Sequence, residues 1–217
     1  MDIDKLKQEM PALDFTQQVF RSPEQQEYFR HYKLDLEDRY PELQHFFGSI
    51  SSGEYQLACH YFRCSTPKGC CFIFHGYYDH AGLFSHLIEF CIQRQLSVVI
   101  YDLPGHGLSS GEQVSISDFA EYQWVLNDVL ERFEDELPDP WYGIAQSTGA
   151  AVLMDYLLDN PQSIFSKTVL LAPLVRPRSW SSISMVATVL RLFGRKISRR
   201  ASNCSNNESF KQFIAEQ

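Results

Sequence analysis

The amino-acid sequence predicts an α/β protein built around a mostly parallel β-sheet. Its 217 residues suffice for one domain with a substantial core. Strands buried on both faces, alternating with amphipathic helices, are typical of parallel sheets, because the crossover connections place helices on both faces. Short continuous apolar runs predict such strands at Cys70–Phe74, Ser97–Tyr101, Trp141–Ala145 and Thr168–Ala172.

The remaining elements are predicted in chain order. Residues 1–47 form a helical N-terminal extension, with helices around Asp4–Met10 and Pro23–Tyr32, and alternating residues predict a strand over Tyr55–Phe62. Helical periodicity between the buried strands predicts further helices at Leu83–Gln95, from Ser115 or Ser117 to Leu137, and at Gln146–Leu158.

These elements divide the chain into three parts. The N-terminal extension ends at residue 47, and residues 48–172 form the N-terminal part of an α/β core. Residues 173–217 are basic, rich in serine and helical in parts, which predicts a partial cap or lid rather than sheet.

Charge is distributed unevenly along the chain. Residues 1–160 hold 10 Lys and Arg against 25 Asp and Glu, whereas residues 161–207 hold 8 Lys and Arg and no acidic residue. This basic block could contact an anionic membrane surface or phospholipid head group. The alternative is a solvated face balanced by the acidic part of the chain. A net charge of −8 argues against nucleic acid as a partner. Seven of the basic residues lie within one stretch: Arg176, Arg178, Arg191, Arg195, Lys196, Arg199 and Arg200.

The cysteines and the N-terminus indicate a cytoplasmic protein without a metal. No spacing among the six cysteines matches a zinc site, so we expect reduced thiols. The N-terminus lacks the basic and apolar regions of a secretory leader, and no apolar run is long enough to cross a bilayer. Contact with a membrane would be peripheral, through the basic cap. The cysteines are Cys59, Cys64, Cys70, Cys71, Cys91 and Cys204.

The segment Ala145-Gln146-Ser147-Thr148-Gly149 follows a buried strand and opens a helix of small and apolar residues. A small-x-Ser-x-Gly pattern between strand and helix is typical of a nucleophile elbow, in which a strained turn lifts the serine hydroxyl clear of the sheet. The helix N-terminus then directs backbone N–H groups at a developing oxyanion. Ser147 is therefore the candidate nucleophile and the Thr148 N–H a candidate oxyanion donor. The alternative is a serine that caps the helix.

Two further loops follow buried strands. His75-Gly76 ends the Cys70–Phe74 strand, and the N–H of Tyr77 is the candidate for the second oxyanion donor. The next buried strand continues into a Gly- and Pro-rich loop that contains Asp102 and His106. We expect His75, Gly76, Asp102 and His106 to support the loops rather than to react. The carboxyl ends of the strands bring all these segments to one sheet edge, where open α/β sheets bind ligands.

Together these segments resemble the α/β-hydrolase superfamily and, within it, the lysophospholipase and monoacylglycerol-lipase branch. That branch has a His-Gly-x-x-x-His segment, matched by residues 75–80, and an Asp-x-x-Gly-His-Gly-x-Ser-x-Gly segment, close to residues 102–111 with one extra serine. Its elbow is matched by Ser147. The resemblance covers roughly residues 15–217. It implies hydrolysis of a lipid carboxylic ester without a cofactor, and a cap that is inserted after the Thr168–Ala172 strand.

One departure from the family pattern concerns the catalytic triad. The family order is Ser, then Asp or Glu, then His, but no histidine follows His106 in this sequence. Asp155 and Asp159 lie in the helix after Ser147 and cannot reach an imidazole at the sheet edge. We therefore expect the last strands of the fold, with the triad acid and base, to be missing from a truncated chain.

The leading hypothesis is a serine hydrolase that cleaves lysophospholipids or monoacylglycerols, with an apolar cap helix at Ile183–Phe193 lining the acyl site. A second hypothesis is a catalytically incomplete module that binds a lipid or a protein partner. An acyltransferase or a peptidase would use the same nucleophile, and fold alone does not separate these activities.

Overall fold

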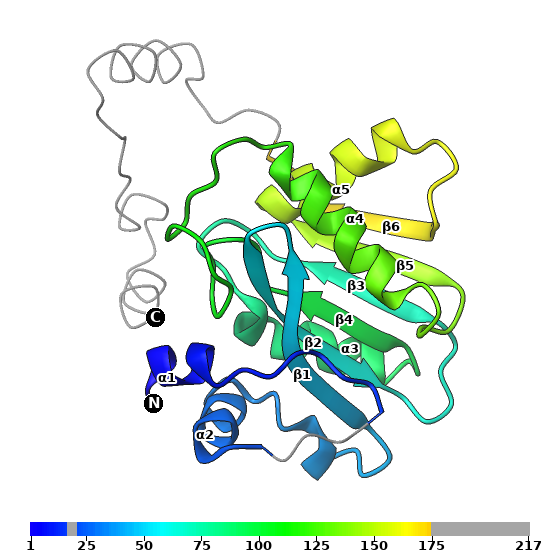
Figure 1. The fold of residues 1–217 in the computed structure, drawn as a ribbon. Helices are drawn as coiled ribbons and strands as arrows, with labels where there is room; N and C mark the ends of the chain where they lie inside the picture. The colour runs from blue at the N-terminus through cyan, green and yellow to red at the C-terminus, as the bar shows by residue number, and fades with distance from the viewer. Residues whose placement is uncertain (17–20, 175–217) are drawn as a thin grey trace, which may run out of the picture. The chain divides into compact units, whose positions relative to one another are not determined.

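Figure 1 shows the computed structural model, which describes residues 1–16 and 21–174. The described residues belong to one compact unit, Met1–Leu174. The expected cap, with its apolar helix and basic block, lies outside the described residues.

The sheet has six strands in the order β1-β2-β4-β3-β5-β6. β3 pairs in parallel with β4 and β5, and β5 pairs in parallel with β6. β1 and β2 form an antiparallel hairpin, and β2 pairs antiparallel with β4. The prediction of a mostly parallel sheet is therefore confirmed. The strands are β1 (Gln44–Ser52), β2 (Tyr55–Arg63), β3 (Cys70–Phe74), β4 (Ser97–Tyr101), β5 (Trp141–Gln146) and β6 (Phe165–Leu171).

Helices cover both faces of the sheet (Figure 1). On one face, α4 (Glu121–Phe133) and α5 (Ser147–Asp159) enclose a core that includes Phe72, Phe133 and Leu153. On the other, α3 (Ser85–Ile92) and α2 (Pro23–Tyr32) belong to a second core with Ile73 and Ile100. Side chains of β3 and β4 alternate between the two cores, which explains why these strands are continuously apolar.

The N-terminal segment runs alongside β1, the first strand in the sheet order, and forms a parallel bridge with it between Ala12 and Ser49. After α1 (Ile3–Gln8), the Leu13 N–H donates to the Ser49 carbonyl at 2.9 Å, and the Ser49 N–H donates to the Pro11 carbonyl at 2.7 Å. α2 begins at Pro23 behind a Ser22 capping box, and a short 3₁₀ helix, η1, covers Leu36–Asp38. The strand β1 was not predicted.

Two helices differ from their predicted bounds. The segment at 83–95 divides into a 3₁₀ turn η2 (Ala81–Phe84) and α3, which ends at Ile92. α4 begins at Glu121 rather than at Ser115 or Ser117, because the preceding residues close a loop of turns. In that loop the Val114 N–H donates to the Gly105 carbonyl, and the Ser115 N–H donates to the Glu112 carbonyl.

The prediction that β6 is buried on both faces was wrong. Phe165 is buried, but Val169 and Leu171 are 50% and 47% exposed. β6 is the last strand in the sheet order, and α5 covers one face of it. Its side chains on the opposite face lie open to solvent.

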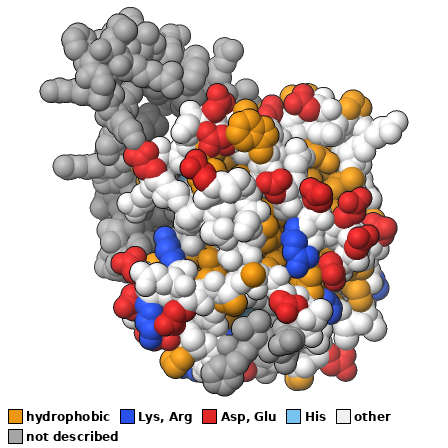
Figure 2. Space-filling view, in the orientation of Figure 1, with side chains coloured by type: hydrophobic (Ala, Val, Ile, Leu, Met, Phe, Trp, Pro, Cys, Tyr) orange, Lys and Arg blue, Asp and Glu red, His pale blue; other side chains and the backbone are white. Residues whose placement is uncertain are grey.

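The surface reflects the acidic composition of the first part of the chain. Asp and Glu side chains are spread over the face shown in Figure 2, with few Lys and Arg among them. No helix in the described ranges is both long and apolar enough to span a membrane. The five cysteines within these ranges are free thiols.

Candidate active site

Ser147 lies on a sharp turn between β5 and α5. Its backbone has φ 50°, in the left-handed region that a serine rarely adopts. The preceding residue, Gln146, is extended, and α5 begins directly at Ser147. The Ser147 carbonyl accepts a hydrogen bond at 3.1 Å from the N–H of Leu174, which follows β6. The serine therefore stands at the sheet edge where the loops after β3, β4 and β6 converge.

Two glycines allow the backbone to approach this turn closely. A Cβ on Gly149 would lie 2.5 Å from the His75 carbonyl oxygen and 2.6 Å from that of Phe74. The Gly149 N–H donates to the same His75 carbonyl at 3.1 Å. A Cβ on Gly76 would lie 3.3 Å from the Cβ of Ser147. Residues 75–76 and the start of α5 are thus in direct contact.

His75 is fully buried and connects the loops that follow β3 and β4. Its Nδ1–H donates to the Gly76 carbonyl at 2.8 Å, and its Nε2 accepts the Leu103 N–H at 2.9 Å. Burial, together with the nearby His106, lowers the pKa of His75 to about 3. The ring is therefore a neutral brace with both nitrogens engaged.

Asp102 is buried at the end of β4 and ties two loops together. Its Oδ1 accepts the Ala81 N–H at 2.6 Å and its Oδ2 accepts the Leu108 N–H at 2.8 Å. Burial raises the pKa of Asp102, while the neighbouring His80 and the two backbone hydrogen bonds oppose that rise. Gly107 has φ 47°, and a Cβ there would lie 2.2 Å from Asp102 Oδ2.

His106 is buried, and its ring contacts that of Tyr77. Its Nδ1–H donates to the Pro104 carbonyl at 2.8 Å, its ring centroid lies 5.4 Å from that of His75, and burial lowers its pKa. Within the described part of the chain, His106 Nε2 has no hydrogen-bond partner, and neither has Oγ1 of the buried Thr148. His106 lies on the loop after β4, and Thr148 lies in the first turn of α5, next to Ser147.

Tyr77 follows Gly76 on the loop after β3. Its side chain is exposed, its ring centroid lies 5.7 Å from that of His106, and its hydroxyl donates to the Val114 carbonyl at 2.8 Å. This contact connects the loop after β3 to the loop after β4. The structure therefore gathers all seven predicted site residues around one sheet edge.

Asp79 was missed by sequence reasoning. Its Oδ2 lies 2.8 Å from the point where a Cβ on Gly76 would stand, which is the point that Ser147 Cβ also approaches. Burial raises the pKa of Asp79, and the Gly76 backbone hydrogen bond and His80 oppose the rise. Its position within the His-Gly-x-x-x-His segment was the available signal. Among residues 1–16 and 21–174, no group of His, Cys, Asp and Glu could hold a metal ion.

The amino-acid sequence is similar to those of known proteins. The sequence profile of the family described as serine aminopeptidase, S33 matches residues 65–215. The monoglyceride lipase of Mus musculus is 33% identical over 161 residues, 71% of this chain and 51% of the relative. That of Homo sapiens is 30% identical over 155 residues, 68% and 49% respectively. The chain thus spans about half the length of these relatives.

Solved structures support the same fold. The monoacylglycerol lipase of Paleococcus ferrophilus superimposes with a TM-score of 0.58 at 23% identity, covering 72% of this chain and 60% of that structure. A carboxyl esterase from Bacillus coagulans gives a TM-score of 0.55 at 18% identity, covering 74% and 54%. Both the predicted resemblance and the α/β-hydrolase fold are confirmed, and the chain belongs to the serine aminopeptidase S33 family of α/β-hydrolases.

Proposed function

We propose that the protein is a serine hydrolase that cleaves carboxylic esters of lipids, with monoacylglycerols or lysophospholipids as its substrates. The observation that carries this proposal is the left-handed backbone of Ser147 at the junction of β5 and α5. A serine held in that conformation directs its hydroxyl away from the sheet, with the N-terminus of a helix behind it.

The chemistry follows from this placement. Ser147 Oγ attacks the ester carbonyl, and the negative charge on the carbonyl oxygen is stabilised by the N–H groups of Thr148 and Tyr77. Collapse of the tetrahedral intermediate expels the alcohol and leaves an acyl-serine, which water then hydrolyses. The serine proton passes to a histidine base and from there to the departing alcohol.

In the triad order of the family, the base and its carboxylate partner follow the nucleophile, and no histidine follows His106 in these 217 residues. His75 is a poor alternative, because both of its ring nitrogens are already hydrogen-bonded to the backbone. Buried loop histidines of low pKa act here as braces.

Lipid esters are the favoured substrates because the mammalian relatives that align over most of this chain are monoglyceride lipases. The family description names an aminopeptidase instead. A peptidase therefore remains the second candidate, since the same nucleophile and oxyanion donors suit an amide carbonyl. A binding module without turnover is the third.

Covalent labelling tests the proposal. The native protein is treated with a fluorophosphonate probe beside Ser147→Ala and the matched control Ser166→Ala, which changes an exposed serine of β6. We expect labelling of the native protein and the control and none of Ser147→Ala. A separate sample of the native protein that has not been treated with the probe is then assayed with a monoacylglycerol, a lysophospholipid and an aminoacyl p-nitroanilide. Hydrolysis of the anilide alone would establish the peptidase, and an unlabelled native protein would contradict both enzymes.

A further inference from the structure

The helix α2 of the N-terminal segment packs against the loop that carries the proposed oxyanion donor. The Tyr32 ring meets the His80 ring edge to face, with centroids 4.8 Å apart and planes at 84°. Tyr32 also lies over Gly82, where a Cβ would come within 2.7 Å of the tyrosine Cγ. Residues 80–82 therefore rest directly on the last turn of α2.

This loop is held at both ends, and its reactive part lies between the two anchors. At its start, His75 accepts the Leu103 N–H. At its end, His80 Nδ1 accepts the Gly82 N–H at 3.2 Å and the Ala81 N–H donates to Asp102. Gly76 and Tyr77 lie between these anchors. A shift of the far anchor would move the Tyr77 N–H relative to Ser147.

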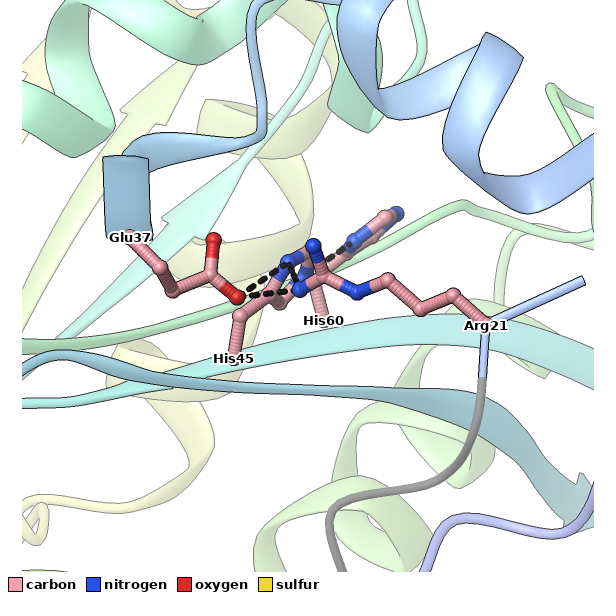
Figure 3. Close-up of polar contacts among 4 residues, drawn as sticks. All are labelled: Arg21, Glu37, His45 and His60. Atoms are coloured by element: carbon pink, nitrogen blue, oxygen red, sulfur yellow. Dashed lines mark hydrogen bonds and ion pairs between the residues drawn. The ribbon is translucent and has the colours of Figure 1, made fainter. Parts of the chain in front are cut away.

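The helix itself is clamped to the sheet by residues on either side of it. Figure 3 shows Arg21, which precedes α2, paired with Glu37, which follows it. Arg21 Nη2 also donates to Nδ1 of His45 in β1 at 3.0 Å. His45 Nε2 in turn lies 2.9 Å from Nδ1 of His60 in β2. We call these four residues, Arg21, Glu37, His45 and His60, the clamp. The clamp fixes α2 against the β1–β2 hairpin, so that Tyr32 is held in place against the loop.

We infer that Tyr32 is a positioning residue for the oxyanion loop, and that the N-terminal segment thereby contributes to the active site. The inference rests on the proposed function. Tyr32 acts through its ring, which fills the space between His80 and Gly82 and prevents the loop end from tilting away from Asp102. It is not required to touch substrate.

The expected kinetic effect is specific. An oxyanion donor acts in the transition state and contributes little to substrate binding, so a displaced donor lowers kcat and leaves KM nearly unchanged. Removing one such donor outright costs about 10²–10³ in kcat. Displacing it through the loss of Tyr32 should cost less, on the order of tenfold.

The test compares kcat and KM of the native protein for a p-nitrophenyl ester with those of Tyr32→Ala and Tyr32→Leu. Tyr32→Phe keeps the ring and should retain wild-type kcat. Arg30→Ala, which changes an exposed side chain of the same helix, is the matched control. Tyr32→Leu keeps apolar volume and addresses the case in which Tyr32→Ala fails to fold. We expect kcat to fall about tenfold in the Leu variant with an unchanged KM.

The outcomes separate this inference from the proposed function. A native protein without esterase activity removes the proposed function itself. An active native protein whose Leu and Ala variants retain wild-type kcat overturns the positioning role alone. A higher KM with an unchanged kcat also overturns it, and so does a loss of kcat in Tyr32→Phe as large as that in Tyr32→Leu. Neither result is expected of a ring that positions the loop.

Discussion

At the scale of single residues, the Ser147 turn combines a strained backbone with contacts that admit no side chain. The left-handed φ of Ser147 costs about 1–3 kcal/mol, which the surrounding contacts must offset. Gly149 permits the closest of these, between the first turn of α5 and the carbonyls of Phe74 and His75. The small residues of the motif are therefore required by backbone approach as much as by chemistry.

Replacing Gly149 tests this requirement. In an unobstructed helix, Gly→Ala stabilises by about 1 kcal/mol. Here the new Cβ would overlap two backbone carbonyl oxygens that cannot move independently of β3. Gly149→Ala should therefore lower the free energy of unfolding by about 1–3 kcal/mol, measured by urea denaturation. A rise in stability would show that the approach is looser than the structure indicates.

Some residues of the candidate site could be predicted from the sequence, and others could not. Ser147, His75 and Asp102 follow buried strands, so local pattern alone places them at one edge. Tyr32 reaches the same edge through α2, which is separated from the loop by more than forty residues of chain. Its role depends on tertiary packing, which no local motif records.

At the scale of elements, the bounds of β3 and β4 were predictable because each is buried on both faces and reads as an unbroken apolar run. β1 was not, because its buried positions include His45, Gly48 and Ser52. Those residues are accommodated by neighbours distant in sequence: His45 by Arg21, Gly48 by the backbone of residues 11–13, and Ser52 by Asp128.

The clamp between α2 and the β1–β2 hairpin predicts acid sensitivity. Burial, with Arg21 and His80 nearby, lowers the pKa of His60 to about 3, and burial with His60 and Arg21 places the pKa of His45 well below its usual value. An unfolded histidine titrates near 6.5. Below that pH the unfolded state binds more protons than the folded state. The contribution of these histidines to the free energy of unfolding is therefore fully present above about pH 6.5 and is lost as the pH drops towards 3.

His60→Gln tests this linkage. Each histidine held neutral contributes a slope of about 1.4 kcal/mol per pH unit within that window. The free energy of unfolding, measured by urea denaturation between pH 7.5 and 4.5, should therefore decline less steeply in the variant, by about one proton. His86→Gln, which changes an exposed histidine of α3, is the control and should retain the native slope. An unchanged slope in His60→Gln would place the acid sensitivity elsewhere.

At the scale of the whole molecule, the sheet is asymmetric. Its β1 edge is covered by the N-terminal segment, which pairs with Ser49, whereas β6 presents one face to solvent. The sequence predicted a buried strand here, because Val169 and Leu171 belong to an apolar run. An apolar pattern indicates which side chains are suited to burial. Whether they are buried depends on other elements that pack over that face of the strand.

Exposed apolar strands at a sheet edge promote association. We therefore expect the open face of β6 to cause self-association of the 217-residue chain at high concentration. The double variant Val169→Lys and Leu171→Lys should reduce self-association, measured by analytical ultracentrifugation. It should also change the free energy of unfolding by no more than about 0.5 kcal/mol, as expected for surface positions. Val98→Lys in β4, where the side chain is fully buried, is the contrasting control and should unfold the protein, because an unpaired charge cannot be buried there. If the double variant is destabilised as severely as this control, both β6 side chains are covered in solution, and the open face is filled by another part of the protein.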